Sequence, residues 1–428
     1  MFCAASAGHN ARGVRTFLIL LIVAAFLLRL GAVVALRDMR QGPKLSLGSD
    51  GVEYDKLAAR MVEGQGYNLR AGQPTSFRAP GFPLFLAGLR LIFKQDYRPQ
   101  YVAFCLLGAL ACGLTYLLAR ELLTEGAARV AAVLLVFYFP HVYFSTAFFS
   151  EVLFVPLVAL ALWQFLVYLR TGSLASVAAA ALALGWAALT RPVAMLIPPV
   201  LIGVLVWSRR KSIRSAVAPV ALLVCGFALV VLPWTARNYR VHGKMVWIAT
   251  NGGSTFYGAN NDWVIATVSH YGEWTSTITQ PGAAEDLAKD EVDRDRSQWR
   301  RGEMWLGSHI RWVPLMLAAK YVRLWLPDIS SPNRAFVLLN VVFTTPFLVL
   351  ILLGQFRMTR GAEFWTPGWL ALHGTGLATV AMALLTWGSS RFRDANAPLL
   401  MVYAAVAVSW LVPSACRLLG RDSRPPDA

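Results

Sequence analysis

Long apolar runs, separated by short connections that carry arginine, are the feature of this sequence that most limits its fold. Runs such as 14–36, 214–236 and 334–356 reach the ~20 residues that an α-helix needs to cross a bilayer. Inside hydrocarbon the backbone must satisfy its own hydrogen bonds, and a helix does so within one segment. Charged residues make up 15% and hydrophobic residues 57% of the 428 residues, whereas a soluble domain carries about a quarter charged residues. The sequence therefore predicts an all-α polytopic membrane protein.

The number and orientation of the spans follow from run length and from the positions of arginine. The segment 80–93 is apolar but short for a transmembrane helix, so we interpret it as a helix lying in the interface. The arginine-rich connections 209–214 and 357–360 then fall on the cytoplasmic side, as membrane topology favours, and so do both termini. This reading predicts about ten transmembrane helices, at 14–36, 100–119, 127–144, 150–170, 174–190, 193–208, 214–236, 334–356, 367–388 and 397–415.

The predicted spans divide the chain into three parts. These are an N-terminal membrane module (1–236) with a first outer loop (37–99), an outer, periplasmic segment (237–333), and C-terminal helices with a cytoplasmic tail (334–428). Helical spacing within 53–61 and the amphipathic stretch 312–326 predict helices that rest on the membrane surface. Much of the formal net charge of +17 lies in short connections, where topology and anionic lipid explain it, so no nucleic-acid partner is expected.

The sequence lacks the common signatures of metal and nucleotide chemistry. None of its five cysteines belongs to a CxxC pair and no His-rich metal spacing occurs, so no metal ligand is predicted from spacing. It has no Walker sequence, no HExxH or GxSxG motif and no dinucleotide fingerprint. A nucleotide-dependent pump and a nucleotide-sugar enzyme are therefore disfavoured.

Two acidic residues stand at the predicted outer ends of spans. Asp50, followed by Tyr54 and an interfacial helix, is placed to accept a proton from a hydroxyl at the water–lipid boundary. The alternative is an exposed acid or a helix cap, and we interpret the neighbouring Glu53 and Asp55 as capping or solvated charges. Glu151 lies where a carboxylate costs a few kcal/mol if it enters hydrocarbon, so it is either functional or solvated at the interface. The predicted topology places Asp50 and Glu151 on one side of the membrane.

Several arginines fall on that same outer side, against the usual positive-inside bias. They are Arg78, Arg191, Arg237, Arg391 and Arg393. Guanidinium groups bind phosphate bidentately and stay charged, so a lipid-linked phosphate is a fitting partner. The alternative is that these side chains extend to lipid headgroups. The glycine- and asparagine-rich loop that begins at Asn251 suits sugar hydroxyls or phosphate, with plain turn formation as its alternative.

Ordered sequence strings connect these residues to a known family. The first outer loop contains Asp50-x-x-x-Tyr54-x-x-x-Ala58, Gly64-x-Gly66-Tyr67, Pro74-Thr75 and Arg78-x-Pro80-Gly81-Phe82-Pro83. Later in the chain come Ser150-Glu151, Arg191-Pro192, Pro233-Trp234-x-x-Arg237-Asn238-Tyr239, and Asn251-Gly252-Gly253 through Gly258-x-Asn260-Asn261. This set resembles bacterial membrane glycosyltransferases of the GT-C type, and most closely the dolichyl-phosphate-mannose protein mannosyltransferases and aminoarabinose transferases. The resemblance covers about residues 14–410.

The resemblance implies an inverting glycosyltransferase of the bacterial cytoplasmic (inner) membrane. Its donor would be a sugar on polyprenyl phosphate, used on the outer face, and its acceptor a protein, a lipid or a polysaccharide. The acid that matches Asp50 is the general base of the family, and the acid that matches Glu151 shapes the acceptor or metal site. Arg78, with Arg391 or Arg393, is expected to hold the leaving phosphate. The remaining substrate-binding residues that we expect are Tyr54, Arg191, Arg237, Asn238 and Asn251.

The sequence also departs from the family. Gly51 follows Asp50 where many relatives carry a second acid, and the later acid is Glu151 rather than an aspartate. No cofactor is firmly implied, and a divalent metal ion stays an open alternative. Two other functions also stay open: a lipid-linked saccharide transporter or flippase that uses the arginines alone, and a polymerase or ligase of lipid-linked glycans.

Overall fold

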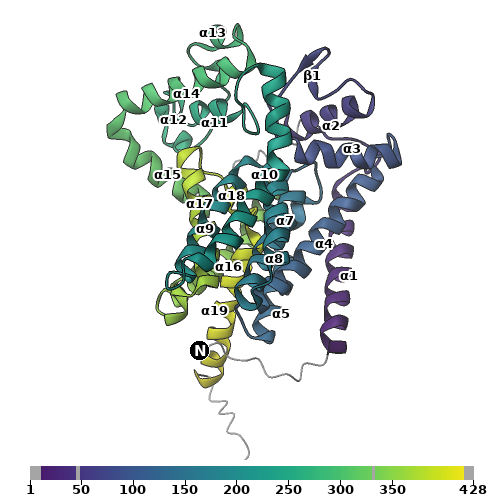
Figure 1. Cartoon of the computed structure of the whole chain (residues 1–428), viewed down its shortest axis with the longest axis vertical. Coiled ribbons are helices and arrows are strands. Elements are labelled where there is room, and N and C mark those ends of the chain that lie inside the picture. The colour runs from purple at the N-terminus through teal and green to yellow at the C-terminus, as the bar shows by residue number, and fades with distance from the viewer. Residues whose placement is uncertain (1–10, 45–48, 330–332, 419–428) are drawn as a thin grey trace, which may run out of the picture.

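The computed structural model describes residues 11–44, 49–329 and 333–418, and helices dominate these ranges (Figure 1). The bundle consists of α1 (Ala11–Leu36), α4 (Arg98–Arg120), α5 (Glu125–Phe137), α6 (Phe139–Phe144), α7 (Glu151–Thr171), α8 (Leu174–Thr190), α9 (Ile197–Ser208), α10 (Arg214–His242), α16 (Arg334–Thr359), α17 (Pro367–Leu385) and α19 (Ala397–Leu418). Each of the ten predicted spans corresponds to helix in this set, so the predicted all-α polytopic fold is confirmed. Both chain ends, and with them the predicted tail after α19, lie outside the described residues.

The bundle helices differ in length. Among the described residues, six helices are long and apolar enough to cross a membrane, namely α1, α4, α7, α10, α16 and α17. Shorter apolar helices lie at Leu174–Thr190, Pro192–Ser208 and Ala397–Val412. The prediction of one continuous helix over 127–144 is wrong, because Tyr138 has an extended backbone between α5 and α6. Pro140 near the start of α6 explains the break, since proline cannot donate the hydrogen bond that would continue α5.

The remaining elements gather at one end of the bundle, which is uppermost in Figure 1 and is called the upper end below. On one side of it lie α2 (Ser49–Val62), the antiparallel pair β1 (Asn68–Arg70) and β2 (Gln73–Pro74), and α3 (Gly81–Phe93). On the other side lie α11 (Gly252–Gly258), α12 (Trp263–Ala266), α13 (Ala283–Leu287), α14 (Glu291–Ser308) and α15 (Val313–Trp325). The short helix α18 (Ser390–Asp394) connects α17 to α19. The helices predicted at 53–61, 80–93 and 312–326 correspond to α2, α3 and α15, and α3 lies across the bundle axis in Figure 1.

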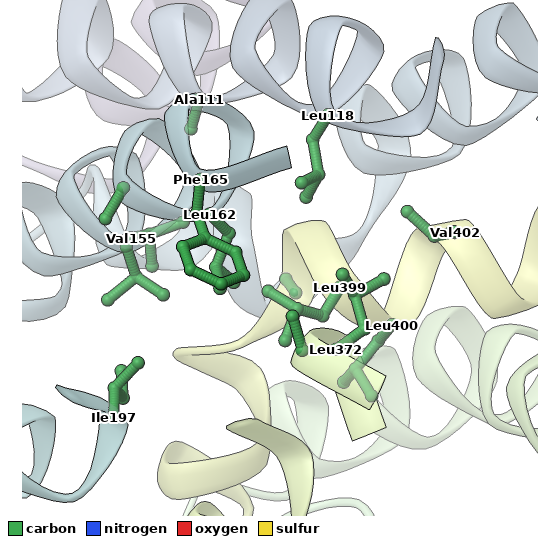
Figure 2. Packing of buried hydrophobic residues seen from close by; sticks show 14 of the residues in the cluster. Ala111, Leu118, Val155, Leu162, Phe165, Ile197, Leu372, Leu399, Leu400 and Val402 are labelled. Atoms are coloured by element: carbon green, nitrogen blue, oxygen red, sulfur yellow. The ribbon is translucent and has the colours of Figure 1, made fainter. Parts of the chain in front are cut away.

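The core is built from apolar side chains that several bundle helices direct toward one another. Figure 2 shows Leu118 of α4, Phe165 of α7 and Leu400 of α19 facing a common centre. Small residues allow the closest approaches between helices, as is usual in membrane bundles. At Gly354 of α16, an added Cβ would overlap the backbone carbonyl oxygen of Tyr403 in α19. This tight core fixes the helix ends that carry the site.

Candidate active site

Asp50 and Glu151 come from different parts of the chain and each begins a helix. Asp50 lies in the first turn of α2, and its side chain is 32% exposed. Glu151 is the first residue of α7 and is fully buried. Carboxylates are favoured at helix N-termini, where backbone N–H groups carry partial positive charge. The two acids therefore occupy positions that stabilise their ionised forms.

Arginines from three further segments surround the two acids. Arg78, in the segment before α3, approaches Asp50 at 2.8 Å and Glu53 at 2.6 Å. Arg191, at the end of α8, approaches Glu151 at 2.7 Å. Glu53, which we interpret from the sequence as a capping or solvated charge, is 30% exposed and also pairs with the Arg78 guanidinium.

Arg391 of α18 joins the two halves of the cluster. Its guanidinium lies 2.8 Å from Glu151 through Nη2, and its Nη1 lies 3.5 Å from Asp50. The Arg391 Nε also donates a hydrogen bond of 2.9 Å to Glu151. The result is an unbroken alternation of acidic and basic groups, in the order Glu53, Arg78, Asp50, Arg391, Glu151 and Arg191.

The alternating charges shift the pKa values of Asp50, Arg78 and Arg391, which lie outside the membrane spans. Burial alone would raise the pKa of Asp50, but the cations Arg78, Arg391 and Arg191 together lower it below the ordinary aspartate value. Burial likewise opposes the charge of Arg78 and Arg391, but the neighbouring carboxylates raise the pKa of both guanidinium groups. Asp50 is therefore an ionised carboxylate at neutral pH, which a general base must be.

A pocket opens beside Asp50. Its lining residues are Pro43, Lys44, Asp50, Gly51, Tyr101, Ala147, Phe148, Phe149 and Arg391. Gly51 leaves it room, since an added Cβ would lie 3.0 Å from the Cβ of Phe148. Sequence reasoning missed Lys44, Tyr101 and the Phe148–Phe149 pair. The two phenylalanines stand just before Glu151, which could have indicated them, but nothing in the sequence indicates Tyr101.

Tyr54 packs between Phe82 of α3 and the Arg78 guanidinium, next to the group of acids and arginines. Its ring packs edge-on against Phe82 of α3 at a centroid distance of 5.3 Å, and the Arg78 guanidinium lies 5.8 Å from the ring centre. Asp55 in the same helix accepts hydrogen bonds from Arg90 at 2.6 Å and from the Tyr97 hydroxyl at 2.9 Å. Asp55 therefore joins α2 to α3 and to the start of α4, and its interpretation as a capping or solvated charge is wrong.

The Arg191 guanidinium forms contacts through Nη1, whereas its Nε has no hydrogen-bond partner among the described residues. Its Nη1 pairs with Glu151 and donates to the Ser150 hydroxyl at 3.2 Å. Its Nε is buried and has no hydrogen-bond partner among the residues that the structure describes. The guanidinium lies between the rings of Phe154 and Phe392, at 5.8 and 5.9 Å from their centres. Arg191 is thus held by Glu151 and Ser150, with one buried nitrogen left unpaired among the described residues.

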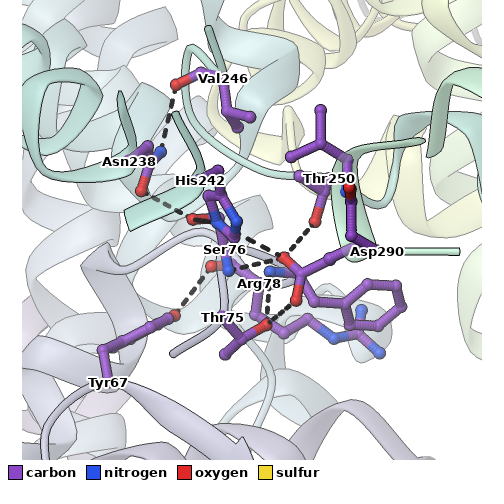
Figure 3. Close-up of polar contacts among 12 residues, drawn as sticks. Tyr67, Thr75, Ser76, Arg78, Asn238, His242, Val246, Thr250 and Asp290 are labelled. Carbon is purple, nitrogen blue, oxygen red and sulfur yellow. Dashed lines mark hydrogen bonds and ion pairs between the residues drawn. The ribbon is translucent and has the colours of Figure 1, made fainter. Parts of the chain in front are cut away.

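Arg237 and Asn238 lie in a separate network around the segment that leads to Arg78. Figure 3 shows Asn238 beside Ser76. Arg237 donates to the Thr75 carbonyl oxygen at 2.7 Å and to the Ser76 hydroxyl at 3.0 Å. Asn238 is fully buried and accepts from the Ser76 hydroxyl at 2.7 Å. Each of these contacts fastens the first loop to the end of α10. The structure therefore places both residues as supports for Arg78 and not beside Asp50.

Glu291 of α14 completes this network from the other side of the upper end. It accepts hydrogen bonds from the Thr75 hydroxyl at 2.5 Å, the Ser76 backbone N–H at 2.7 Å and the Thr250 hydroxyl at 2.6 Å. Sequence reasoning missed Glu291, which stands in a charged helix without a motif. Its carboxylate ties the segment 237–333 to the loop that carries Arg78.

The remaining two predicted residues also have structural contacts. Asn251 precedes α11, and its carbonyl oxygen accepts a hydrogen bond from the Thr255 backbone N–H at 3.1 Å. Arg393 is buried, pairs with Asp394 at 2.8 Å and donates 2.7 Å to the Trp325 carbonyl oxygen at the end of α15. A cation at a helix C-terminus satisfies free carbonyl groups. The structure thus directs Arg391 to the acids, whereas Arg393 anchors α18 to α15.

The chain is a helical bundle in which two acids and three arginines converge at one end. The model of the family "Dolichyl-phosphate-mannose-protein mannosyltransferase" matches residues 77–234. This match confirms the resemblance over residues 77–234, a range that includes Arg78, Glu151 and Arg191. No curated protein sequence matches the chain significantly.

Two solved structures of archaeal enzymes are similar to the chain in fold, and a bacterial one matches it more weakly. The archaeal oligosaccharyltransferase AglB from Archaeoglobus fulgidus, in complex with an inhibitory peptide and a dolichol-phosphate, is 13% identical with a TM-score of 0.53, and the match covers 97% of this chain and 52% of that one. An Archaeoglobus fulgidus oligosaccharyltransferase with Zn and sulfate is 16% identical with a TM-score of 0.54, covering 94% and 50%. ArnT from Cupriavidus metallidurans bound to undecaprenyl phosphate is 15% identical with a TM-score of 0.44, covering 98% and 82%. The chain spans about half the length of the archaeal enzymes that it matches.

Proposed function

We propose that this chain is a membrane glycosyltransferase that moves a sugar from a polyprenyl-phosphate donor to an acceptor hydroxyl. The observation that carries the proposal is the pair Asp50 and Glu151, joined through Arg391 and flanked by Arg78 and Arg191. The family match over residues 77–234 supports the same assignment. Similar folds occur in structures with dolichol-phosphate and undecaprenyl phosphate, which are lipid phosphates of the proposed donor class.

The proposed mechanism is a direct displacement with inversion at the anomeric carbon. An acceptor hydroxyl in the pocket gives its proton to Asp50, and its oxygen forms a bond to the anomeric carbon. The bond between that carbon and the phosphate oxygen breaks, and polyprenyl phosphate leaves. A phosphate is a weak base, so its developing charge needs cations nearby rather than a protonating acid.

The cations that face the leaving phosphate are Arg78 and Arg191 in this proposal. All the donor nitrogens of Arg391 are directed at Asp50 and Glu151, whereas the Arg191 Nε has no partner among the described residues. Arg393 is committed to the end of α15. We therefore replace Arg391 and Arg393 by Arg191 in the phosphate-binding set, beside Arg78.

The site lies on the outer face of a bacterial cytoplasmic membrane in this proposal, with both chain termini on the cytoplasmic side. The distribution of arginine supports this orientation, since the connections 209–214 and 357–360 lie at the end of the bundle away from the site. The acceptor is then a protein, a lipid or a polysaccharide in the outer compartment. A transporter of lipid-linked saccharides would need the arginines but not an ionised carboxylate in the pocket wall.

Replacement of Arg191 tests the binding of the donor phosphate. We expect Arg191→Gln to raise KM for a labelled polyprenyl-phosphate sugar by about tenfold or more, because a charge-assisted hydrogen bond to phosphate contributes about 1.5–3 kcal/mol. The measurement is the initial rate of label transfer by the full chain reconstituted in vesicles, over a range of donor concentrations.

A matched control exists at the opposite end of the bundle. Arg170 also pairs with a glutamate, Glu121, at 2.7 Å, but its side chain is 58% exposed. Arg170→Gln should leave the KM for the donor unchanged. An unchanged KM in Arg191→Gln as well would remove Arg191 from the phosphate site.

A further inference from the structure

The two acids of the site raise the question of a bound cation. One archaeal oligosaccharyltransferase of similar fold was solved with Zn, and two carboxylates that face one another are a common start of a metal site. Structural and catalytic Zn²⁺ takes three or four protein ligands. Mg²⁺ and Ca²⁺ take six or more oxygens, and Mg²⁺ commonly takes only one or two of them from protein carboxylates and the others from water and substrate phosphate.

The carboxylate oxygens of the site already face positive or donor groups. Asp50 Oδ1 pairs with Arg78 at 2.8 Å and Oδ2 with Arg391 at 3.5 Å. Glu151 Oε1 pairs with Arg191 at 2.7 Å and with Arg391 at 2.8 Å, and its Oε2 accepts from the Ser150 hydroxyl at 3.3 Å. A divalent ion between the acids would have to displace Arg391 and would lie beside two more arginines.

Among the described residues, no third metal-ligating His, Cys, Asp or Glu side chain is grouped with the two acids. Over residues 11–44, 49–329 and 333–418, no three His, Cys, Asp or Glu side chains are grouped so that they could hold a metal ion. Gly51, next to Asp50, has no side chain, and an acid there would start 3.0 Å from the Cβ of Phe148. Because Asp50 and Glu151 are already paired with guanidinium groups, and no third acid, His or Cys is grouped with them among the described residues, this donor set does not fit a divalent cation.

Arg391 has the properties that a resident cation needs. Its guanidinium keeps its charge at every physiological pH, and its planar fork can face two carboxylates at once. Glu151 is fully buried, and a buried carboxylate needs paired positive charge to stay ionised. Arg191 provides part of this charge at 2.7 Å. A guanidinium between Asp50 and Glu151 adds to that charge and fixes the distance between the two acids.

The backbone around Arg391 is also held in place. The Ser389 hydroxyl accepts the Arg391 backbone N–H at 3.3 Å, and the Gly388 N–H donates 2.9 Å to the Gly272 carbonyl oxygen. On the other side, Arg393 holds α18 to the end of α15. Hydrogen bonds on both sides of α18 thus hold the Arg391 guanidinium next to Asp50 and Glu151.

We propose that the guanidinium of Arg391 takes the place of a divalent cation between Asp50 and Glu151, so that no metal ion binds at this site. Arg391 is then a positioning residue, which holds Asp50, the proposed base, at a fixed distance from the buried Glu151. The consequence for catalysis, transfer without added metal, rests on the proposed function. The binding claim itself does not.

The test measures Mn²⁺ binding to the purified full chain by electron paramagnetic resonance, after removal of metal with a chelator. We expect the wild type and the double variant Asp50→Asn/Glu151→Gln to bind equally little Mn²⁺. Arg391→Ala should bind one Mn²⁺ about tenfold more tightly than the wild type, because the positive charge between the two acids is gone. Arg78 and Arg191 still pair with the acids on their outer sides. Arg391→Lys, which keeps a cation, should bind no more than the wild type.

Two results would overturn the proposal. One is a single Mn²⁺ site in the wild type that the double variant loses, and the other is Mn²⁺ binding by Arg391→Ala that does not exceed the wild type. Sugar transfer is measured separately with and without the chelator. A complete absence of transfer would refute the proposed enzyme but leave the binding comparison intact, whereas transfer that the chelator abolishes and Mn²⁺ restores would refute the role of Arg391.

Discussion

Asp50→Asn is expected to lower the rate of sugar transfer by about a thousandfold, within the range that general-base catalysis contributes. The amide has nearly the shape of the carboxylate but cannot take the proton of the acceptor hydroxyl. The lowered pKa of Asp50, caused by Arg78, Arg391 and Arg191 against the opposing effect of burial, keeps the wild-type base ionised. The measurement is the initial rate of label transfer from a polyprenyl-phosphate sugar in reconstituted vesicles.

Measuring how Asp50→Asn binds the labelled donor distinguishes loss of the base from unfolding of the protein. Because the arginines stay in place, Asp50→Asn should still bind the labelled donor. Glu63→Gln removes an exposed acid just beyond the end of α2 and should transfer at the wild-type rate. Transfer by Asp50→Asn at the wild-type rate would exclude Asp50 as the base, and would favour a transporter that uses the arginines alone.

Glu151→Ala should have the largest effect on stability. The variant leaves the guanidinium groups of Arg191 and Arg391 without their shared partner at a fully buried position. Removing one partner of a buried ion pair costs about 3–5 kcal/mol, because the remaining charge is uncompensated. Thermal unfolding of the detergent-solubilised protein should therefore begin at a clearly lower temperature.

The chain offers a matched glutamate for comparison. Glu121 also pairs with an arginine, Arg170, at 2.7 Å, but that arginine is 58% exposed. An ion pair exposed to solvent contributes about 0–1 kcal/mol, so Glu121→Ala should unfold close to the wild type. Equal losses in the two variants would mean that burial of Glu151 does not set the cost.

Much of the fold could be predicted from the sequence, because a chain segment inside the bilayer core must satisfy its own backbone hydrogen bonds and therefore forms a helix. Apolar runs of sufficient length become helices, and the helices at α2, α3 and α15 were predicted from spacing and amphipathic pattern. The break between α5 and α6 was missed, because apolar content alone does not reveal where Pro140 interrupts a run. Packing of small residues, such as Gly354 against Tyr403, likewise depends on partners that are distant in sequence.

The site could be predicted in part. Topology placed Asp50, Glu151, Arg78, Arg191 and Arg391 on one side of the membrane, and the structure brings these five side chains together. Their chemical roles stay predictions. Nothing in the sequence separates Arg391 from Arg393, since they stand two residues apart in one short helix. Only their partners, an acid in one case and helix carbonyl groups in the other, distinguish them.

Arg237 and Asn238 show a second limit. A family pattern marks both residues, but the pattern does not say whether they touch substrate or hold the residue that does. In the structure they fasten Thr75 and Ser76, which lie just before Arg78. Holding the loop that carries Arg78 explains the presence of Arg237 and Asn238 in the family pattern as well as substrate binding does.

The most direct test of the central claim is to follow the lipid product. The full chain is reconstituted in vesicles with a labelled polyprenyl-phosphate sugar and an acceptor fraction, and free polyprenyl phosphate and glycosylated acceptor are both quantified. The proposed displacement predicts one polyprenyl phosphate released for each sugar transferred, with the anomeric configuration inverted. Movement of the intact donor across the bilayer, without release of polyprenyl phosphate, would contradict it.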